Sequence, residues 1–441
     1  MPLNEILALA SIASFFVLLA LGVPVAITLA VTGFFFGYLG FGAGLFDLLP
    51  ARIFGVVSNY TLIAIPLFVF MGVMLEKSRI ADDLMDVIGH LAGSLRGGMG
   101  IGIILFGVLM GATTGIVGAT IVTLGVLALP ALIRRGYNAP IACGTICASG
   151  TLGQVIPPSL ILILMADIMG LSVGTLFAAA LLPGLALAGI FCLFLLVLGL
   201  VKPHWVPPVE LDERRALPGR QLLVMALRSA VPPFALVIAV LGSIIGGVAA
   251  PTEAASMGAL GSMLVVGLAG RFSLGVLRET VRSTARITAQ IIFILVCAQV
   301  FALAFRGLQG EQLVHDAFTA VPGGIEGTIL FMLLLIFVLG FFIEWIEISY
   351  IVVPLFLPLL MAGNVDLVWA AILIAVMLQT SFLTPPFGWA LFYLRGVTPP
   401  EIPTTAIYLG VLPFIAMQIF AVAMVFLNPE LATWLPKAIG W

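Results

Sequence analysis

The sequence predicts an all-α polytopic membrane protein built as an inverted repeat, with two re-entrant hairpins and two broken helices. Composition gives the first part of this prediction, since 62% of the 441 residues are apolar and 9% are charged. A soluble protein of this size needs far more polar surface. Two proline pairs in apolar runs, Pro157-Pro158 and Pro385-Pro386, give the second part. The positions of the basic residues give the third, because they indicate which loops face the cytoplasm.

Long apolar runs predict spanning helices. Ile6–Leu21 and Leu176–Val201 are continuous apolar stretches, whereas strands of a membrane barrel alternate polar and apolar residues over about ten positions. We interpret the first run as a retained helix, because it is too long for the apolar core of a signal peptide. The net charge of −2 provides no basic excess for phosphates, so the expected surroundings are membrane lipid and no nucleic acid.

Three polar stretches interrupt the apolar pattern. Residues 202–228 combine bases, acids and prolines, which predicts a linker between two membrane halves. Glu76–Arg96 and Arg271–Arg286 each place their apolar residues on one helical face. That pattern favours amphipathic helices along the membrane interface, and a solvated connector is the alternative.

The basic residues predict the orientation. If all 18 except Arg52, Arg306 and Lys437 face the cytoplasm, the N-terminus lies outside the cytoplasm. Met99–Ile133 then has both ends inside, and Gly327–Met361 has both ends outside. We therefore predict two re-entrant hairpins that enter from opposite sides, with two full short helices as the alternative for each.

The two halves repeat at an offset of 228 residues, which relates Pro157 to Pro385. Pro130 lies 27 residues before the first proline pair, and Pro358 lies 27 residues before the second. A proline pair breaks a helix, because proline lacks the backbone donor and clashes with the preceding turn. Broken backbone at membrane depth survives only inside protein or around a wet cavity. Hairpins and broken helices in an inverted repeat predict a secondary transporter with its site near the membrane midplane.

These patterns divide the chain into segments with distinct expected roles. In order, we expect 1–98 as N-terminal scaffold helices and the first amphipathic arm, 99–168 as the first hairpin and broken helix of a transport domain, 169–201 as a scaffold helix, 202–228 as a cytoplasmic linker, 229–286 as scaffold helices and the second amphipathic arm, 287–326 as a helix leading to the second hairpin, 327–397 as the second hairpin and broken helix of the transport domain, and 398–441 as a C-terminal helix and tail.

The first cluster of candidate ligands combines the first hairpin tip with the first break. Hydroxyls and freed backbone carbonyls are hard oxygen ligands that suit a small alkali cation such as sodium, and glycine lets the backbone approach closely. Close helix packing by small residues is the alternative, and it is favoured for Gly118 and Gly125. The predicted cation ligands here are Ala112, Thr113, Thr114, Gly115, Gly150, Thr151 and Gly153.

The second cluster combines the second hairpin tip with the second break. Its carboxylates, Glu344 and Glu347, are costly inside a membrane and therefore indicate function. One of them can pair with a cation while the other binds a proton or caps a helix. The alternative is that one reaches the outer surface. The predicted cation ligands here are Glu344, Glu347, Thr380, Ser381 and Thr384.

We expect the transported anion between the two tips and the two breaks. The N-termini of the half-helices offer their dipoles and free N–H groups to a carboxylate there. The predicted substrate-binding residues are Gln154, Pro157, Pro158, Ser159, Ser349, Pro385, Pro386 and Gly388.

Enzymatic function is not expected. The sequence contains no P-loop and no His-Glu-x-x-His motif, so we expect no catalytic residue, no cofactor and no metal beyond sodium. A channel and an intramembrane enzyme using Glu344 and Glu347 are the less favoured alternatives, since the polar residues cluster at two tips. Glu253, after Pro251, has the position of an acid in the first turn of a helix.

Four motifs in matching order resemble the large membrane subunit of tripartite ATP-independent periplasmic (TRAP) transporters. They are Ile65-Pro-Leu-Phe68, Arg134-Arg-Gly-Tyr137, Gly150-Thr-Leu-Gly-Gln-Val-Ile-Pro-Pro-Ser159 and Leu383-Thr-Pro-Pro-Phe-Gly388. The resemblance implies an elevator-type carrier like those of the ion-transporter superfamily, in the bacterial inner membrane with a periplasmic N-terminus. It also implies import of an organic acid coupled to sodium, with proton coupling as the alternative, and two partners: a small four-helix membrane subunit and a periplasmic substrate-binding protein.

The sequence departs from the family pattern at the first hairpin tip. Family members often have Ser-Gly-Ser there, and this chain has Thr114-Gly115-Ile116. One hydroxyl is kept and one is lost, which implies greater reliance on backbone carbonyls for the first cation site. The Glu344–Glu347 tip and the 379–384 run resemble the branch of the family that handles monocarboxylates such as 2-oxo acids, hydroxy acids and aromatic acids.

Overall fold

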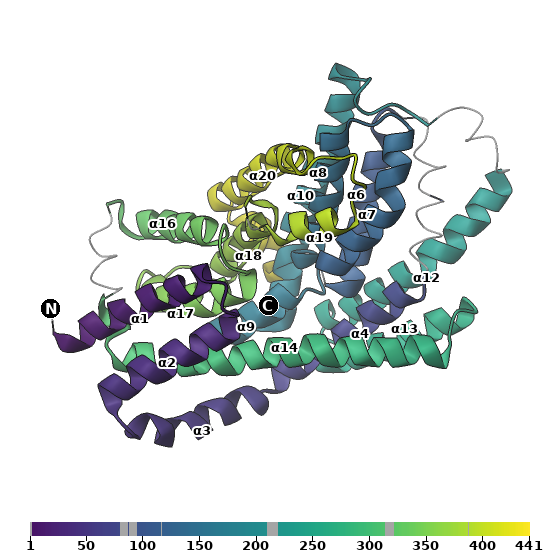
Figure 1. Ribbon diagram of the computed structural model, residues 1–441. Coiled ribbons are helices and arrows are strands. Elements are labelled where there is room, and N and C mark those ends of the chain that lie inside the picture. The colour runs from purple at the N-terminus through teal and green to yellow at the C-terminus, as the bar shows by residue number, and fades with distance from the viewer. Residues whose placement is uncertain are drawn as a thin grey trace. The chain divides into compact units, whose positions relative to one another are not determined.

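The computed structural model describes residues 2–79, 87, 95–115, 117–209, 219–313, 322–386 and 388–441. Every regular element in these ranges is a helix (Figure 1). Eight of the described helices are long and apolar enough to cross a membrane. Large apolar side chains on them are widely exposed, for example Leu200 at 80% and Leu427 at 75%, which suits a surface that faces lipid. The chain is therefore an all-α, multi-pass membrane protein.

The described chain forms two compact units. The first contains Met1–Tyr60, Ala285–Ile336 and Ile346–Leu367. Its helices are α1 (Leu3–Ala20), α2 (Val25–Phe41), α3 (Gly44–Val57) and most of α14 (Leu274–Gly307), α16 (Gly324–Leu339) and α17 (Trp345–Ala362).

The second unit contains Thr61–Thr284, Phe337–Trp345 and Val368–Trp441. Its helices are α4 (Ala64–Lys77), α6 (Gly98–Thr114), α7 (Val117–Arg134), α8 (Ala139–Thr151), η3 (Leu152–Gln154), α9 (Leu160–Met169), α10 (Val173–Val201), α12 (Gly219–Ile245), α13 (Pro251–Leu268), α18 (Leu367–Leu383), α19 (Trp389–Val397), α20 (Thr404–Leu427) and α21 (Glu430–Ala438), and the 3-10 turn η1 (Tyr60–Ile63) lies at its start.

Close packing in the first unit depends on small residues. A Cβ added to Gly33 of α2 would lie 2.7 Å from the backbone nitrogen of Phe301 in α14, so only glycine fits there. The rings of Phe15 in α1 and Phe301 pack with their centroids 5.8 Å apart. Helices α1, α2 and the C-terminal part of α14 therefore form one packed group.

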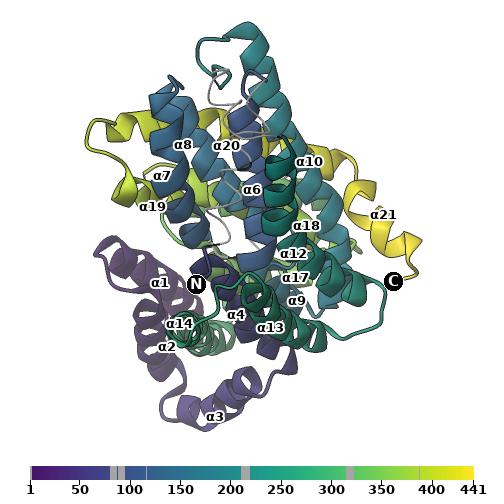
Figure 2. The same ribbon diagram turned by 90° about the vertical axis from the view of Figure 1, so that its right-hand side faces the viewer.

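Helix α8 is the central helix of the second unit. It contacts α6, α7, α19 and α20 (Figure 2), and residues 141–151 are all buried. A Cβ on Gly144 of α8 would overlap the backbone carbonyl of Gly410 in α20, so the two helices meet backbone to backbone. The Sγ of Cys147 lies 3.7 Å from the carbonyl oxygen of Ala390 in α19. Elements from both halves of the sequence thus pack around one helix.

The predicted hairpins and breaks are present. Helices α6 and α7 flank a tip at Gly115, and α16 and α17 flank a turn at residues 340–344. Helices α8 and α9 are separated by η3 and Pro157-Pro158, and α18 and α19 by Pro385-Pro386. Both prolyl pairs contain a cis peptide bond. The predicted fold class, with its two hairpins and two broken helices, is confirmed.

The spacing of the helices agrees with the predicted repeat. Helices α7 and α17 begin at Val117 and Trp345, and α8 and α18 begin at Ala139 and Leu367. Both pairs differ by the offset of 228 residues that relates the proline pairs. The helix start predicted around Glu253 is also confirmed, because α13 begins at Pro251 and the Glu253 carboxylate accepts a hydrogen bond from the Ala250 amide at 2.9 Å.

The polar stretches differ in outcome. Most of the first predicted arm, Glu76–Arg96, lies outside the described residues, and so does 210–218 of the linker. The second predicted arm begins before α14, which runs unbroken from Leu274 to Gly307 and crosses the boundary set after residue 286. No proline lies between these two residues to end the helix. Arg271, just before α14, donates to the carbonyl of Ser78 at 3.2 Å.

Residues 202–209, the first part of the linker, form a strap beside the first hairpin. The carbonyl of Val206 accepts a hydrogen bond from the Gly97 amide, and the carbonyl of Trp205 accepts one from the Asn138 amide, each at 2.9 Å. Val206 is fully buried, and the Lys202 ammonium lies 3.8 Å above the centroid of the Trp205 ring. The strap therefore joins the end of α10 to the starts of α6 and α8.

Candidate functional site

The first break lies at the end of α8. The helix gives way to the 3-10 turn η3 after Thr151, and the proline pair that follows cannot continue an α-helix. The backbone carbonyl of Thr151 accepts a hydrogen bond from Nε2 of Gln379 at 3.0 Å. The Thr151 hydroxyl donates to the carbonyl of Ala148 at 2.9 Å. A residue of the second broken helix thus binds directly to the first break.

The first hairpin tip contacts the first break. Gly115 has a left-handed backbone with φ of 59°, which glycine adopts without strain. Its carbonyl accepts a hydrogen bond from Nε2 of Gln154 at 3.0 Å. Gly111 of α6 and Gly153 of η3 approach so closely that a Cβ on either would overlap the backbone of the other. The structure therefore brings the predicted tip and break residues together.

Of the remaining predicted ligands in this cluster, Ala112 and Gly150 are fully described, and Thr113 and Thr114 are described by their backbones. Ala112 and Gly150 are buried, and a Cβ on Gly150 would overlap the side chain of Ile121. The backbones of Thr113 and Thr114 end helix α6, and their side chains, like residue 116, lie outside the described part of the chain. Gly118 packs on the Tyr393 ring and Gly125 on Val397, which supports the packing alternative for those two glycines.

The second break offers hydroxyl oxygens. Thr380 donates to the carbonyl of Met377 at 2.7 Å, and Ser381 donates to the carbonyl of Leu378 at 2.6 Å. Thr384 donates to the carbonyl of Thr380. All three side chains are buried. Since each hydroxyl hydrogen is used within α18, the oxygens remain as acceptors for a cation.

The acidic residues of the second tip fall in different units. Glu344 is part of the turn before α17 and belongs to the second unit with the breaks. Glu347 and Ser349 lie in α17, in the first unit, and are 2% and 0% exposed. Their contact with the breaks therefore stays a prediction.

Both half-helices that follow the breaks begin without a side-chain cap. Helix α9 begins after Ser159, whose hydroxyl donates to the carbonyl of Gln154, and α19 begins after Gly388, whose amide donates to Thr384 at 2.9 Å. Neither residue caps the helix that follows it. Within the described part of the chain, no side-chain cap occupies the first N–H groups of either helix, which makes them candidate donors to an anion.

Gln418 contacts the first break and is absent from the residues that the sequence analysis predicts for the site. It lies in α20 and is buried. Its Nε2 lies 3.4 Å from the Thr151 hydroxyl oxygen, and the two residues are 267 positions apart in the sequence. The one available signal is that an amide stands alone in an apolar helix, which is costly in a membrane.

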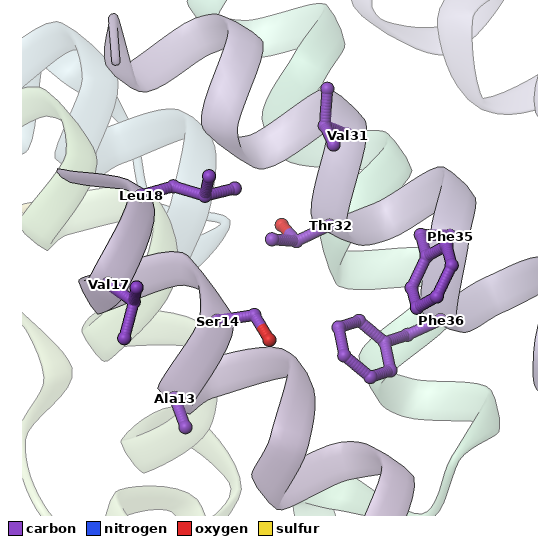
Figure 3. Close-up of a pocket in the computed structure, with 8 residues that line it drawn as sticks. All are labelled: Ala13, Ser14, Val17, Leu18, Val31, Thr32, Phe35 and Phe36. Atoms are coloured by element: carbon purple, nitrogen blue, oxygen red, sulfur yellow. The ribbon is translucent and has the colours of Figure 1, made fainter. Parts of the chain in front are cut away.

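An apolar hollow in the first unit is distinct from these clusters. It lies between α1 and α2 and encloses about 350 Å³ (Figure 3). Val17, Val31 and Phe35 line it and are also widely exposed, whereas the hydroxyl of Thr32 bonds to the carbonyl of Thr28 at 2.7 Å. The hollow contains no predicted site residue, and its lining suits contact with lipid chains.

A hairpin tip and two broken helices that meet at buried polar residues, in an all-helical membrane protein with a second hairpin, are typical of a secondary transporter. Residues 12–431 match the sequence profile of the tripartite ATP-independent periplasmic transporter, DctM component. The chain belongs to this family, and it is a transporter subunit rather than an enzyme.

Relatives in this family carry several different names. The chain is 29% identical to the C4-dicarboxylate TRAP transporter large permease protein DctM of Pseudomonas aeruginosa, over 89% of this chain and 90% of that protein. It is 28% identical to the ectoine TRAP transporter large permease protein TeaC of Halomonas elongata, over 95% and 96%. It is 27% identical to the sialic acid TRAP transporter large permease protein SiaM of Vibrio cholerae, over 95% and 96%.

Solved structures share the fold at low sequence identity. The YdaH transporter of Alcanivorax borkumensis superimposes with a TM-score of 0.61 at 16% identity, covering 90% of this chain and 89% of that one. MtrF of Neisseria gonorrhoeae superimposes with a TM-score of 0.56 at 14% identity, over 87% and 84%. These likenesses concern the overall fold.

Proposed function

We propose that this chain is the large membrane subunit of a carrier that imports an organic acid across the bacterial inner membrane. The relatives are named for C4-dicarboxylates, ectoine and sialic acid, and all three kinds of solute bear a carboxylate. In this proposal a periplasmic binding protein delivers the solute, a small four-helix membrane subunit completes the complex, and the N-terminus is periplasmic.

One observation carries the proposal. The two breaks are joined by the hydrogen bond between Gln379 and Thr151, and each break is followed by a half-helix whose N-terminus lacks a side-chain cap. Free N–H groups at a helix N-terminus, with the positive end of the helix dipole, bind carboxylates. The carboxylate would therefore lie near Ser159 and Gly388, among the predicted substrate residues.

Sodium would drive the import. The hydroxyl oxygens of Thr380, Ser381 and Thr384, and backbone carbonyls at the first tip, are neutral hard ligands suited to an alkali cation. Sodium there would balance the charge of the anion and hold the tips closed. Coupling to protons through Glu344 or Glu347 is the alternative.

We further propose that the solute crosses by an elevator movement. Support comes from the contacts that join the first hairpin, the first break and the second break within one unit: Gly115 with Gln154, Gly111 with Gly153, and Thr151 with Gln379. Elements held together in this way can move as one block past the rest of the protein.

Uptake by proteoliposomes tests this function. The chain is reconstituted with its small subunit and binding protein, and the solutes are a C4-dicarboxylate, ectoine and sialic acid. We expect saturable uptake of a carboxylate under an inward sodium gradient and its loss in Thr384→Leu with the folded protein intact. Uptake driven equally by a proton gradient in potassium would favour the alternative coupling, and wild-type uptake in Thr384→Leu would refute the site.

A further inference from the structure

Three buried glutamines meet at the first break. Gln154 follows Thr151 in the same turn, Gln379 comes from α18 and Gln418 comes from α20. Each is at most 3% exposed. Each amide nitrogen has a partner, which is the carbonyl of Gly115 for Gln154 and Thr151 for the other two.

The partners determine how the amides are oriented. Gln154 and Gln379 face backbone carbonyls, which only accept hydrogen bonds, so the NH2 group must be on that side. Gln418 faces the Thr151 hydroxyl oxygen, whose hydrogen is donated to Ala148. That oxygen can therefore only accept as well. In all three residues the amide oxygen is left on the other side.

None of these three amide oxygens has a hydrogen-bond partner among the described residues. Buried acceptors are normally satisfied, since an unpaired one is unfavourable in a low-dielectric interior. The amide nitrogens of Gln379 and Gln418 both bind Thr151. The unpaired oxygen of each belongs to the same amide group as that nitrogen, so both oxygens lie near Thr151. The arrangement therefore provides acceptors and lacks a donor or a positive charge.

We propose that the amide oxygens of Gln379 and Gln418 bind a monovalent alkali cation beside Thr151, at a site shared by both breaks and α20. Amide oxygens are hard, neutral ligands, which suits sodium better than calcium or magnesium, since those ions favour carboxylates. This inference rests on the proposed function, in which sodium drives transport. It adds ligands outside both predicted cation clusters and brings α20 into the site.

The test measures equilibrium binding of sodium rather than transport. Thermal unfolding of the purified full-length chain is followed as sodium replaces potassium at constant ionic strength, because a ligand of the folded state raises the melting temperature with its concentration. The variants are Gln379→Met and Gln418→Met, which keep side-chain length and lose the hard oxygen. The matched control is Gln299→Met, at a half-buried glutamine in the apolar part of α14.

We expect sodium to raise the melting temperature of the wild type and of Gln299→Met with the same half-saturating concentration. In Gln379→Met and Gln418→Met that concentration should increase by about tenfold or more, as the loss of one ligand to a charge implies. Unchanged sodium dependence in both variants would overturn the proposal and indicate a buried water at these oxygens. No sodium-specific rise in the wild type would refute the sodium coupling as well.

A second variant covers the case in which the methionine proteins do not fold. Gln418→Glu keeps the length and an oxygen and adds a negative charge, so sodium should bind about tenfold more tightly than in the wild type. An unchanged half-saturating concentration in Gln418→Glu would also overturn the proposal.

Discussion

The two breaks occupy equivalent positions in the two halves, yet they are stabilised in different ways. The first break is held by other elements, through Gly111 of α6 and through the side chains of Gln379 and Gln418. Among the described residues, the second break makes local bonds: the hydroxyls of Thr380, Ser381 and Thr384 donate to carbonyls of α18, and the Gly388 amide donates to the carbonyl of Thr384. Pro157 and Pro158 are buried, whereas Pro385 is half-buried and Pro386 is exposed.

This difference teaches that a repeated spacing does not impose a repeated environment. The first break is embedded in a packed polar network, so its substitution should cost folding stability as well as function. The second break has local bonds and a more open proline pair, so its substitution should affect ligand binding more than stability. The following predictions test this contrast, beginning with the largest expected effect.

Gly153→Ala should have the largest effect of the substitutions in this comparison. Its Cβ would overlap the backbone of Gly111, and neither backbone can move aside as a flexible side chain can. We expect destabilisation of at least about 1–3 kcal/mol and loss of uptake, measured by thermal unfolding and by proteoliposome transport. The control is Gly189→Ala in α10, where a Cβ would meet nothing within 4 Å. Equal stability of the two variants would contradict the tight contact between tip and break.

Thr151→Val and Thr384→Val compare the breaks directly. Thr151→Val removes the bond to Ala148 and leaves the Gln418 amide nitrogen without its acceptor, which should cost about 1–3 kcal/mol. Thr384→Val removes one local bond, from the residue after α18 to the carbonyl of Thr380 in that helix, and should cost less, about 0.5–1.5 kcal/mol. Both should weaken the rise in melting temperature caused by sodium. A larger stability loss for Thr384→Val would reverse the contrast.

Glu253→Gln should have the smallest effect on thermal stability. Because Glu253 is outside both breaks, this variant shows how much a substitution elsewhere in the protein changes stability. The carboxylate accepts from the Ala250 amide at the start of α13, and its charge favours the helix dipole by about 0.3–1 kcal/mol. We expect a correspondingly small decrease in thermal stability, with uptake unchanged. Glu401→Gln, at an exposed turn residue, is the control. Loss of uptake in Glu253→Gln would assign this acid a role in transport.

Much of the fold could be predicted because its determinants are local in sequence. Apolar length predicts α10, proline chemistry predicts the breaks, and charge around Met99–Ile133 predicts the first hairpin. The continuity of α14 was not foreseen, because its polar start and its apolar remainder were interpreted as two segments. Helical periodicity alone does not indicate where an amphipathic helix merges into a spanning one.

The site was predictable only in part, for a related reason. Thr151, Gly153 and Gln154 stand in one motif, and their hydroxyl, glycine and amide chemistry marks them. Gln418 has no neighbouring motif, and its contact with Thr151 depends on how α20 packs against α8. Contacts between residues this distant in sequence follow from tertiary packing, which composition and spacing do not specify.

The bond between Gln379 and Thr151 joins two positions separated by the repeat offset of 228 residues. In a symmetric homodimer of one ancestral half, a position that meets its own equivalent carries the same residue on both sides. Two threonines or two glutamines would then have faced each other. Fusion of the halves into one gene allows the pair to differ, so that an amide on one side can satisfy a released carbonyl on the other. The pairing of Gln379 with Thr151 is therefore asymmetric. Gene duplication alone would give identical residues at the two positions, and divergence after fusion makes different ones possible.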